Sequence, residues 1–161
     1  MSRVSIDLLI DRTGSLSPDD SKTHLRFPFR LDRECANLHI EFDYSPKLLE
    51  DEERARELLD AAFELYVEPA RRAAARANAE RYLPLANLVT VSVDDPNRYR
   101  GACHRQDPMQ RLHLSAVEAS PGLLPGRIEE GEWTLTLSVH AIVTESCSYR
   151  LKAWATGEDN E

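Results

Sequence analysis

Five histidines and three cysteines are the side chains of this 161-residue chain best suited to bind a metal ion or to attack a substrate. They form no HxH, HExxH or CxxC pattern. The adjacent Cys103 and His104 have a poor chelating spacing, because neighbouring strand side chains point to opposite faces. The histidines on the polar faces of predicted strands could share one sheet surface: His39, His113 and His140. They are the candidate metal ligands, and a metal-dependent hydrolase that uses this His-bearing face is one functional hypothesis.

Motifs for covalent catalysis and phosphate binding are absent from the sequence. There is no GxSxG nucleophile elbow, and the six glycines, mostly in predicted turns, build no phosphate-binding loop. Cys35 and Cys147 fall at predicted strand starts, where they are best interpreted as small half-buried residues. We therefore predict no catalytic residue and no cofactor.

A ligand-binding surface is suggested by one loop and one tryptophan. The cluster Arg98, Tyr99 and Arg100 can stack on a ligand and donate charge-assisted hydrogen bonds. Trp154 occupies one of the polar positions in the alternation of its strand, so we expect it on a surface. An exposed aromatic ring can stack on a sugar. A β-sandwich that binds a small ligand or a glycan through these four residues is a second hypothesis.

The overall composition excludes several classes of partner. Twenty Lys and Arg against 28 Asp and Glu give a formal charge of −8, and no long segment is basic, so nucleic acid is not an expected partner. No apolar run approaches the roughly 18 residues of a membrane span. No signal peptide is recognisable, and three widely spaced cysteines do not suggest a disulfide framework. We expect a cytoplasmic globular protein.

Most of the chain has the alternating apolar and polar residues of half-buried strands. The N-terminal strand is expected to end at a turn made by residues 12–15. Pro28 lies inside the second predicted strand, which places that strand at a sheet edge or a bulge. The predicted strands cover residues 3–11, 23–31, 36–44, 88–93, 112–117, 133–141 and 149–154.

Residues 46–82 change to a helical period. Ser45 is a candidate N-cap and Pro46 suits the first helical turn, whereas Pro69 predicts a kink. The helix should carry an apolar stripe that could form an interaction surface with a protein partner or in a homodimer: Leu58, Phe63 and Tyr66. We therefore expect one antiparallel, jelly-roll-like β-sandwich over residues 1–161, with a helical insertion at about 46–82 and a frayed acidic tail at 157–161.

Several short strings of residues resemble a known family. The C-terminal half has SPGLLPG at residues 120–126, GEW at 131–133 and YRL at 149–151. Earlier strings are FPF at 27–29, FDYSP at 42–46 and DDPNRYRG at 94–101. In this order they resemble the β-sandwich domain that precedes the catalytic domain of bacterial PHP-type metal-dependent phosphoesterases of the CehA/McbA kind.

The resemblance implies an accessory rather than a catalytic role. Phosphoesterase activity in that family belongs to the PHP domain, whose metal ligands begin with an HxH pair, and this sequence has neither the pair nor the length of that domain. No catalytic residue is carried over. The leading expectation is a stand-alone, non-catalytic binding or interaction module, with an enzyme on a separate chain as its partner. The proline-glycine pairs, Gly131 and Trp133 are expected to have architectural roles.

Overall fold

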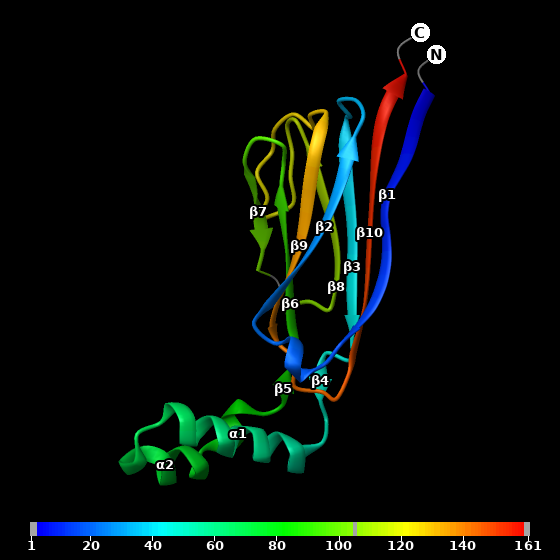
Figure 1. Ribbon diagram of the computed structural model, residues 1–161. Coiled ribbons are helices and arrows are strands. Elements are labelled where there is room, and N and C mark those ends of the chain that lie inside the picture. The colour runs from blue at the N-terminus through cyan, green and yellow to red at the C-terminus, as the bar shows by residue number, and fades with distance from the viewer. Residues whose placement is uncertain (1–2, 105, 160–161) are drawn as a thin grey trace.

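The computed structural model describes residues 3–104 and 106–159 and shows two four-stranded antiparallel sheets packed face to face (Figure 1). Sheet A contains, in spatial order, β1 (Arg3–Leu16), β10 (Cys147–Asp159), β3 (Asn37–Ser45) and β8 (Met109–Ser115). Sheet B contains β2 (Thr23–Leu31), β9 (Gly131–Ala141), β6 (Leu88–Asp94) and β7 (Tyr99–Cys103). Eight strands divided in this order between two sheets form a jelly roll, which confirms the predicted fold class.

The core lies between the sheets and follows the alternation of the sequence. Sheet A buries Leu38, Ile40 and Phe42 of β3, and the residues that alternate with them face outward. Sheet B contributes Val91 of β6 and the fully buried Trp133 of β9. Pairs of apolar inner faces of this kind are the main source of stability in a β-sandwich.

Two strand predictions at the N-terminus have different outcomes. The turn expected at residues 12–15 is wrong, because β1 continues to Leu16 and Gly14 pairs with Tyr149 of β10. The tyrosine ring occupies the space in which a side chain at Gly14 would lie, which explains a glycine inside a strand. The position of Pro28 is as predicted, since β2 is an edge strand of sheet B.

The two ends of the described chain are paired with each other. Arg3 is opposite Asp159, and the β1–β10 ribbon extends beyond the other strands at the end of the sandwich where both termini lie. The expected frayed tail at 157–161 is therefore wrong for residues 157–159, which continue β10. Residues 160 and 161 lie outside the described residues. Strand β7 has no counterpart among the predicted strands, because the sequence indicates a loop over its residues.

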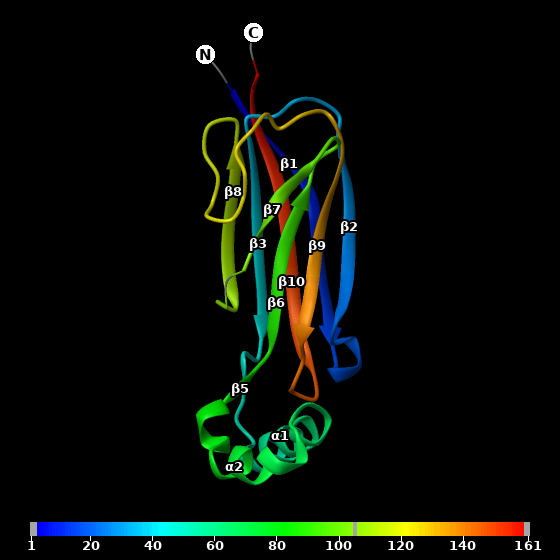
Figure 2. The ribbon, with the colours of Figure 1, turned by 90° about the vertical axis from the view of Figure 1, so that its left-hand side faces the viewer.

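The helical insertion projects from the opposite end of the sandwich and covers neither sheet (Figure 2). It leaves and returns through a two-stranded ribbon, β4 (Leu48–Leu49) paired with β5 (Leu85–Ala86). Between them lie α1 (Glu52–Tyr66) and α2 (Arg72–Ala77), with 3-10 turns at Pro69–Arg71 and Ala79–Tyr82. A further 3-10 turn, Pro18–Asp20, joins β1 to β2.

The insertion begins later than the sequence suggested. Ser45 still belongs to β3, and the N-cap of α1 is Asp51, whose carboxylate accepts from the backbone N–H of Arg54 at 3.1 Å. The expected break at Pro69 is confirmed, since α1 ends at Tyr66 and a 3-10 turn starts at the proline. Within the described residues, no helix is both long and apolar enough to cross a membrane.

A buried asparagine fixes the neck between the insertion and the sandwich. Asn87 is fully buried, and its amide nitrogen donates to the carbonyl of Pro46 at 2.9 Å and to the hydroxyl of Thr144 at 2.8 Å. Its side-chain oxygen accepts from the backbone N–H groups of Val143 and Thr144. One side chain thus joins three segments that are distant in sequence. Each of its hydrogen bonds replaces one that water would make if the site were exposed.

We predict that Asn87→Ala lowers the free energy of unfolding by about 3 kcal/mol, because several buried partners lose their hydrogen bonds. Urea denaturation followed by circular dichroism measures the change. The matched control is Asn78→Ala at an exposed position on the insertion, where we expect a loss of less than about 1 kcal/mol. Equal losses in the two variants would contradict the role assigned to Asn87.

Candidate functional site

The predicted ligand residue Arg100 is a structural residue, because its side chain is buried. The guanidinium is 1% exposed and lies over the ring of Trp133, 5.4 Å from its centroid. It donates to the carbonyl oxygens of Leu124 at 3.0 Å, Gly126 at 2.9 Å and Arg127 at 3.1 Å. All three acceptors belong to the loop that follows β8, so Arg100 ties this loop to β7 and cannot reach a ligand.

The charge of Arg100 is balanced by Asp95, whose side chain is 4% exposed. A guanidinium nitrogen lies 3.1 Å from the Oδ2 atom of the carboxylate. The Oδ1 atom accepts from the backbone N–H groups of Asn97 at 2.7 Å and Arg98 at 2.6 Å. Burial raises the pKa of Asp95, but these two backbone hydrogen bonds and the Arg100 guanidinium outweigh it and hold the pKa below its usual value. The pair is a buried ion pair with its hydrogen bonds satisfied.

Two glycines allow the same loop to approach β7 closely. Gly101 has φ +109° and Gly122 has φ +97°, and a side-chain carbon on either would lie within 2.5 Å of a backbone oxygen of the other segment. The strings DDPNRYRG and SPGLLPG therefore form one structural unit. Gly131 has φ +131° and begins β9, two residues before the buried Trp133. These are the architectural roles expected from the sequence.

The four predicted ligand-binding residues do not form one site. Tyr99 is 53% exposed at the edge of sheet B, and Arg98 is exposed beside it. Trp154 belongs to β10 and faces outward from sheet A, on the opposite side of the sandwich. With Arg100 buried between the sheets, the predicted cluster is divided among three environments.

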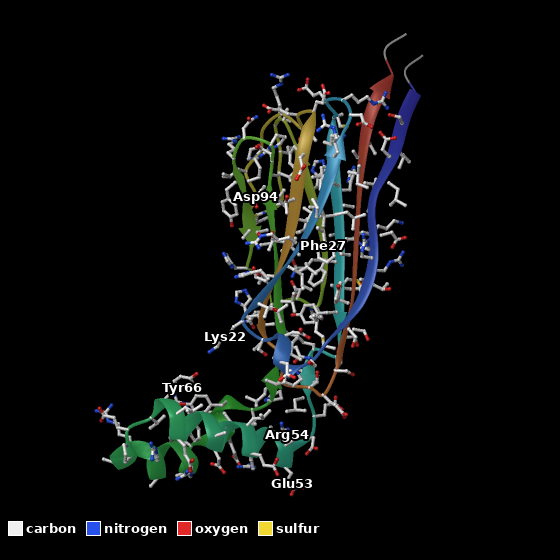
Figure 3. All side chains as sticks on the ribbon, viewed as in Figure 1. Lys22, Phe27, Glu53, Arg54, Tyr66 and Asp94 are labelled. Carbon is white, nitrogen blue, oxygen red and sulfur yellow. The ribbon has the colours of Figure 1, made fainter. Side chains whose placement is uncertain are left out.

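The predicted helix surface is also divided. Phe63 is buried with Leu59 and Ala79 in a small core of the insertion that is separate from the main core. Leu58 is half-buried, whereas Tyr66 is 75% exposed at the end of α1 far from the sandwich (Figure 3). The apolar stripe is thus used mainly to hold the insertion together, and only its end remains available to a partner.

A row of side chains crosses the outer face of sheet A and brings together three of the sequence candidates. The register pairs Leu8 with Trp154, Trp154 with His39, and His39 with His113, across β1, β10, β3 and β8. We call these four residues the sheet A row. The indole of Trp154 stacks on the ring of His39 with centroids 5.2 Å apart and planes 15° apart.

The two histidines of the row are in contact and partly buried. Their ring centroids lie 5.2 Å apart. The Nε2 atom of His113 is 2.8 Å from the Oδ1 atom of Asn37, and that of His39 is 3.5 Å from the hydroxyl of Thr156. Burial lowers the pKa of His39, and the neighbouring His113 lowers it further. The lowered pKa favours the neutral imidazole form of His39.

The apolar end of the sheet A row owes its exposure to a β-bulge. The register of β1 shifts between Leu8 and Ile10, so Ile10 enters the core while Leu8 stays on the outer face. Leu8 is 60% exposed, and Ile6, two residues before it on the same face, is 70% exposed. Sequence parity alone assigns Ile6, Leu8 and Ile10 to one face, and nothing in the sequence marks the bulge except the extra apolar residue Leu9.

The expected convergence of three histidines is wrong for His140. It lies on β9 of sheet B and faces outward, where its Nε2 atom is 2.8 Å from the hydroxyl of Thr90. The two sheets turn their outer faces in opposite directions, so His140 cannot join His39 and His113. In the described part of the chain, no three His, Cys, Asp or Glu side chains gather closely enough to hold a metal ion together.

The predicted structural role of the cysteines agrees with their surroundings. Cys147 is buried at the start of β10, and burial raises the pKa of its thiol. Cys35 is half-buried, and burial raises its pKa too, with a further contribution from the charge of Asp7. A raised pKa keeps both sulfurs in the poorly nucleophilic thiol form, and no disulfide joins the cysteines within the described residues.

A hollow of about 560 Å³ lies where the neck meets the insertion. Leu48 and Leu83 form part of its apolar lining, and Glu50 and Glu52 part of its polar lining. Arg56 also lines it, but its guanidinium lies 3.6 Å from the carboxylate of Glu80. This charge is thus already partnered inside the insertion, and we assign no ligand to the hollow.

We predict that Arg100→Met lowers the free energy of unfolding by about 3 kcal/mol or more, because Asp95 and three loop carbonyls lose a buried donor. Urea denaturation measures the loss. Arg98→Met is the matched control, since the Arg98 side chain is 58% exposed, and we expect a change below about 1 kcal/mol. A small effect of Arg100→Met would show that the loop is held by other contacts.

A second prediction concerns acid stability. Because the folded-state pKa of Asp95 is below its unfolded value, its stabilising contribution is complete above about pH 4 and is lost as the pH falls through the folded pKa. The stability difference between wild type and Asp95→Asn should be constant from pH 7 to 5 and shrink below about pH 4. Asp32→Asn, at a side chain that is 94% exposed, is the control and should differ little from wild type throughout. A difference between wild type and Asp95→Asn that stays unchanged down to pH 2.5 would exclude this linkage.

No protein-family model matches the sequence. No curated protein matches it either.

Proposed function

We propose that this protein is a non-catalytic interaction module that binds a protein partner through the outer face of sheet A. The observation that carries the proposal is the exposure of Ile6 (70%) and Leu8 (60%) directly beside the half-buried Trp154. Large apolar side chains that are exposed together on a rigid sheet mark interaction sites more often than isolated ones do. Tryptophan is also enriched among the residues that dominate binding energy.

The surroundings of this patch have the character of an interface rim. The next row of the same face is charged and includes Lys152, Glu41 and Arg111. Arg111 lies 3.8 Å from Glu41, and a further ion pair joins Arg150 to Asp11 at 3.3 Å. An apolar centre next to charged, solvent-exposed pairs is the usual anatomy of a protein–protein interface.

The sequence resemblance supports the choice of partner. We propose that the chain is a bacterial, cytoplasmic accessory domain whose partner is a PHP-type phosphoesterase domain. The mainly architectural use of Arg100, Trp133 and the two close glycines fits a domain whose motifs maintain shape rather than catalyse a reaction. A small-ligand or glycan site receives less support, because the residues expected to form it lie apart.

The double variant Ile6→Ser/Leu8→Ser tests the proposal. Each side chain buried in an interface contributes about 1.5–3 kcal/mol, so we expect the variant to bind a purified PHP-type catalytic domain at least tenfold more weakly than wild type. Isothermal titration calorimetry measures the affinity. The positions are exposed, so the urea denaturation midpoint should change little.

Leu65→Ser is the matched control, because Leu65 is 76% exposed on α1 of the insertion. It should leave the affinity unchanged. If Leu65→Ser weakens binding and the double variant does not, the partner binds the insertion and the sheet A proposal is wrong. Absence of binding to PHP-type domains would remove this partner, and phosphodiesterase turnover by the purified chain with added metal would exclude a non-catalytic role.

A further inference from the structure

The rings of His39 and His113 lie next to each other on the outer face of sheet A. They are directly opposite each other on the neighbouring antiparallel strands β3 and β8. Their ring centroids are 5.2 Å apart. An imidazole nitrogen lies about 2.0–2.1 Å from a zinc ion, so two imidazoles at a tetrahedral ion have centroids about 5 Å apart. The backbone register thus already sets the spacing that a metal would require.

One tautomer of each ring leaves its Nδ1 atom available to a metal ion. The Nε2 atom of His113 lies 2.8 Å from the Oδ1 atom of Asn37, and the tautomer with its proton on Nε2 donates to that oxygen. The lone pair of His113 is then on Nδ1. The Nε2 atom of His39 lies 3.5 Å from the hydroxyl oxygen of Thr156, and the tautomer with its proton on Nε2 likewise has its lone pair on Nδ1. Metal-binding histidines commonly donate their second nitrogen in this manner.

We propose that His39 and His113 form a two-histidine site for a divalent transition-metal ion such as Zn²⁺ on the outer face of sheet A. Neutral imidazole is the ligand that such ions prefer, and calcium or magnesium would be poorly held because they require oxygen ligands. Water would complete the coordination, since no third His, Cys, Asp or Glu side chain joins the pair among the described residues. The stacked indole of Trp154 restricts the orientation of His39.

Zinc titration of the untagged full chain tests the site. Calorimetry should show one ion bound per chain, and the imidazole resonances of His39 and His113 should be the ones that shift in two-dimensional NMR spectra. His39→Gln and His113→Gln should each weaken binding at least tenfold. Asn37→Leu, which removes the acceptor for the second nitrogen of His113, should weaken binding by about tenfold without removing a ligand.

His140→Gln is the matched control, because His140 faces outward from sheet B and is paired with Thr90. It should bind zinc like the wild type. Equal zinc affinity in wild type and His39→Gln, or an equal loss in His140→Gln, would overturn the site. The inference does not depend on the proposed function, and the double variant Ile6→Ser/Leu8→Ser should retain zinc binding.

Discussion

The buried guanidinium of Arg100 is the interaction on which one end of the jelly roll depends. It is held by Asp95 on one side and by three loop carbonyls on the other, and it covers the ring of Trp133. Burying a charge is costly unless hydrogen bonds replace its water, and here both ionic groups have such partners. A long loop without regular structure can therefore lie against β7 as a fixed part of the fold. The close approach at Gly101 and Gly122 is a condition for this arrangement, because side chains there would push the loop away.

At the other end of the sandwich, the uncharged side chain of Asn87 holds three chain segments together through hydrogen bonds. It closes the sandwich beneath the helical insertion, and the insertion has its own small core around Phe63. Since the two cores are separate, the main core is complete without the insertion. The insertion thus adds to one end of the protein without contributing to the core of the eight-stranded sandwich.

The fold was largely predictable from the sequence, because alternation of apolar and polar residues reports directly on half-buried strands such as β3 and β9. Failures occurred where a contact distant in sequence decides the outcome. Gly14 suggests a turn until Tyr149 is known to pack on it, and Arg100 resembles a ligand-binding residue until the loop carbonyls surround it. The candidate site was predictable only as separate residues. Alternation places Trp154, His39 and His113 each on an outer face, but their alignment depends on strand register. The exposure of Leu8 depends on a one-residue bulge.

The pairing of Arg3 with Asp159 has a mechanical consequence. A force that pulls the two ends of the chain apart acts across the β1–β10 ribbon from its open end and breaks the hydrogen-bonded pairs one after another, as in a zipper. Resistance to such a force is low compared with shearing a whole strand at once. The pairs that include Ile6 and Leu8 would separate before those that line the core. Tension on the chain ends would therefore remove Leu8 from the sheet A row while most of the sandwich remained folded.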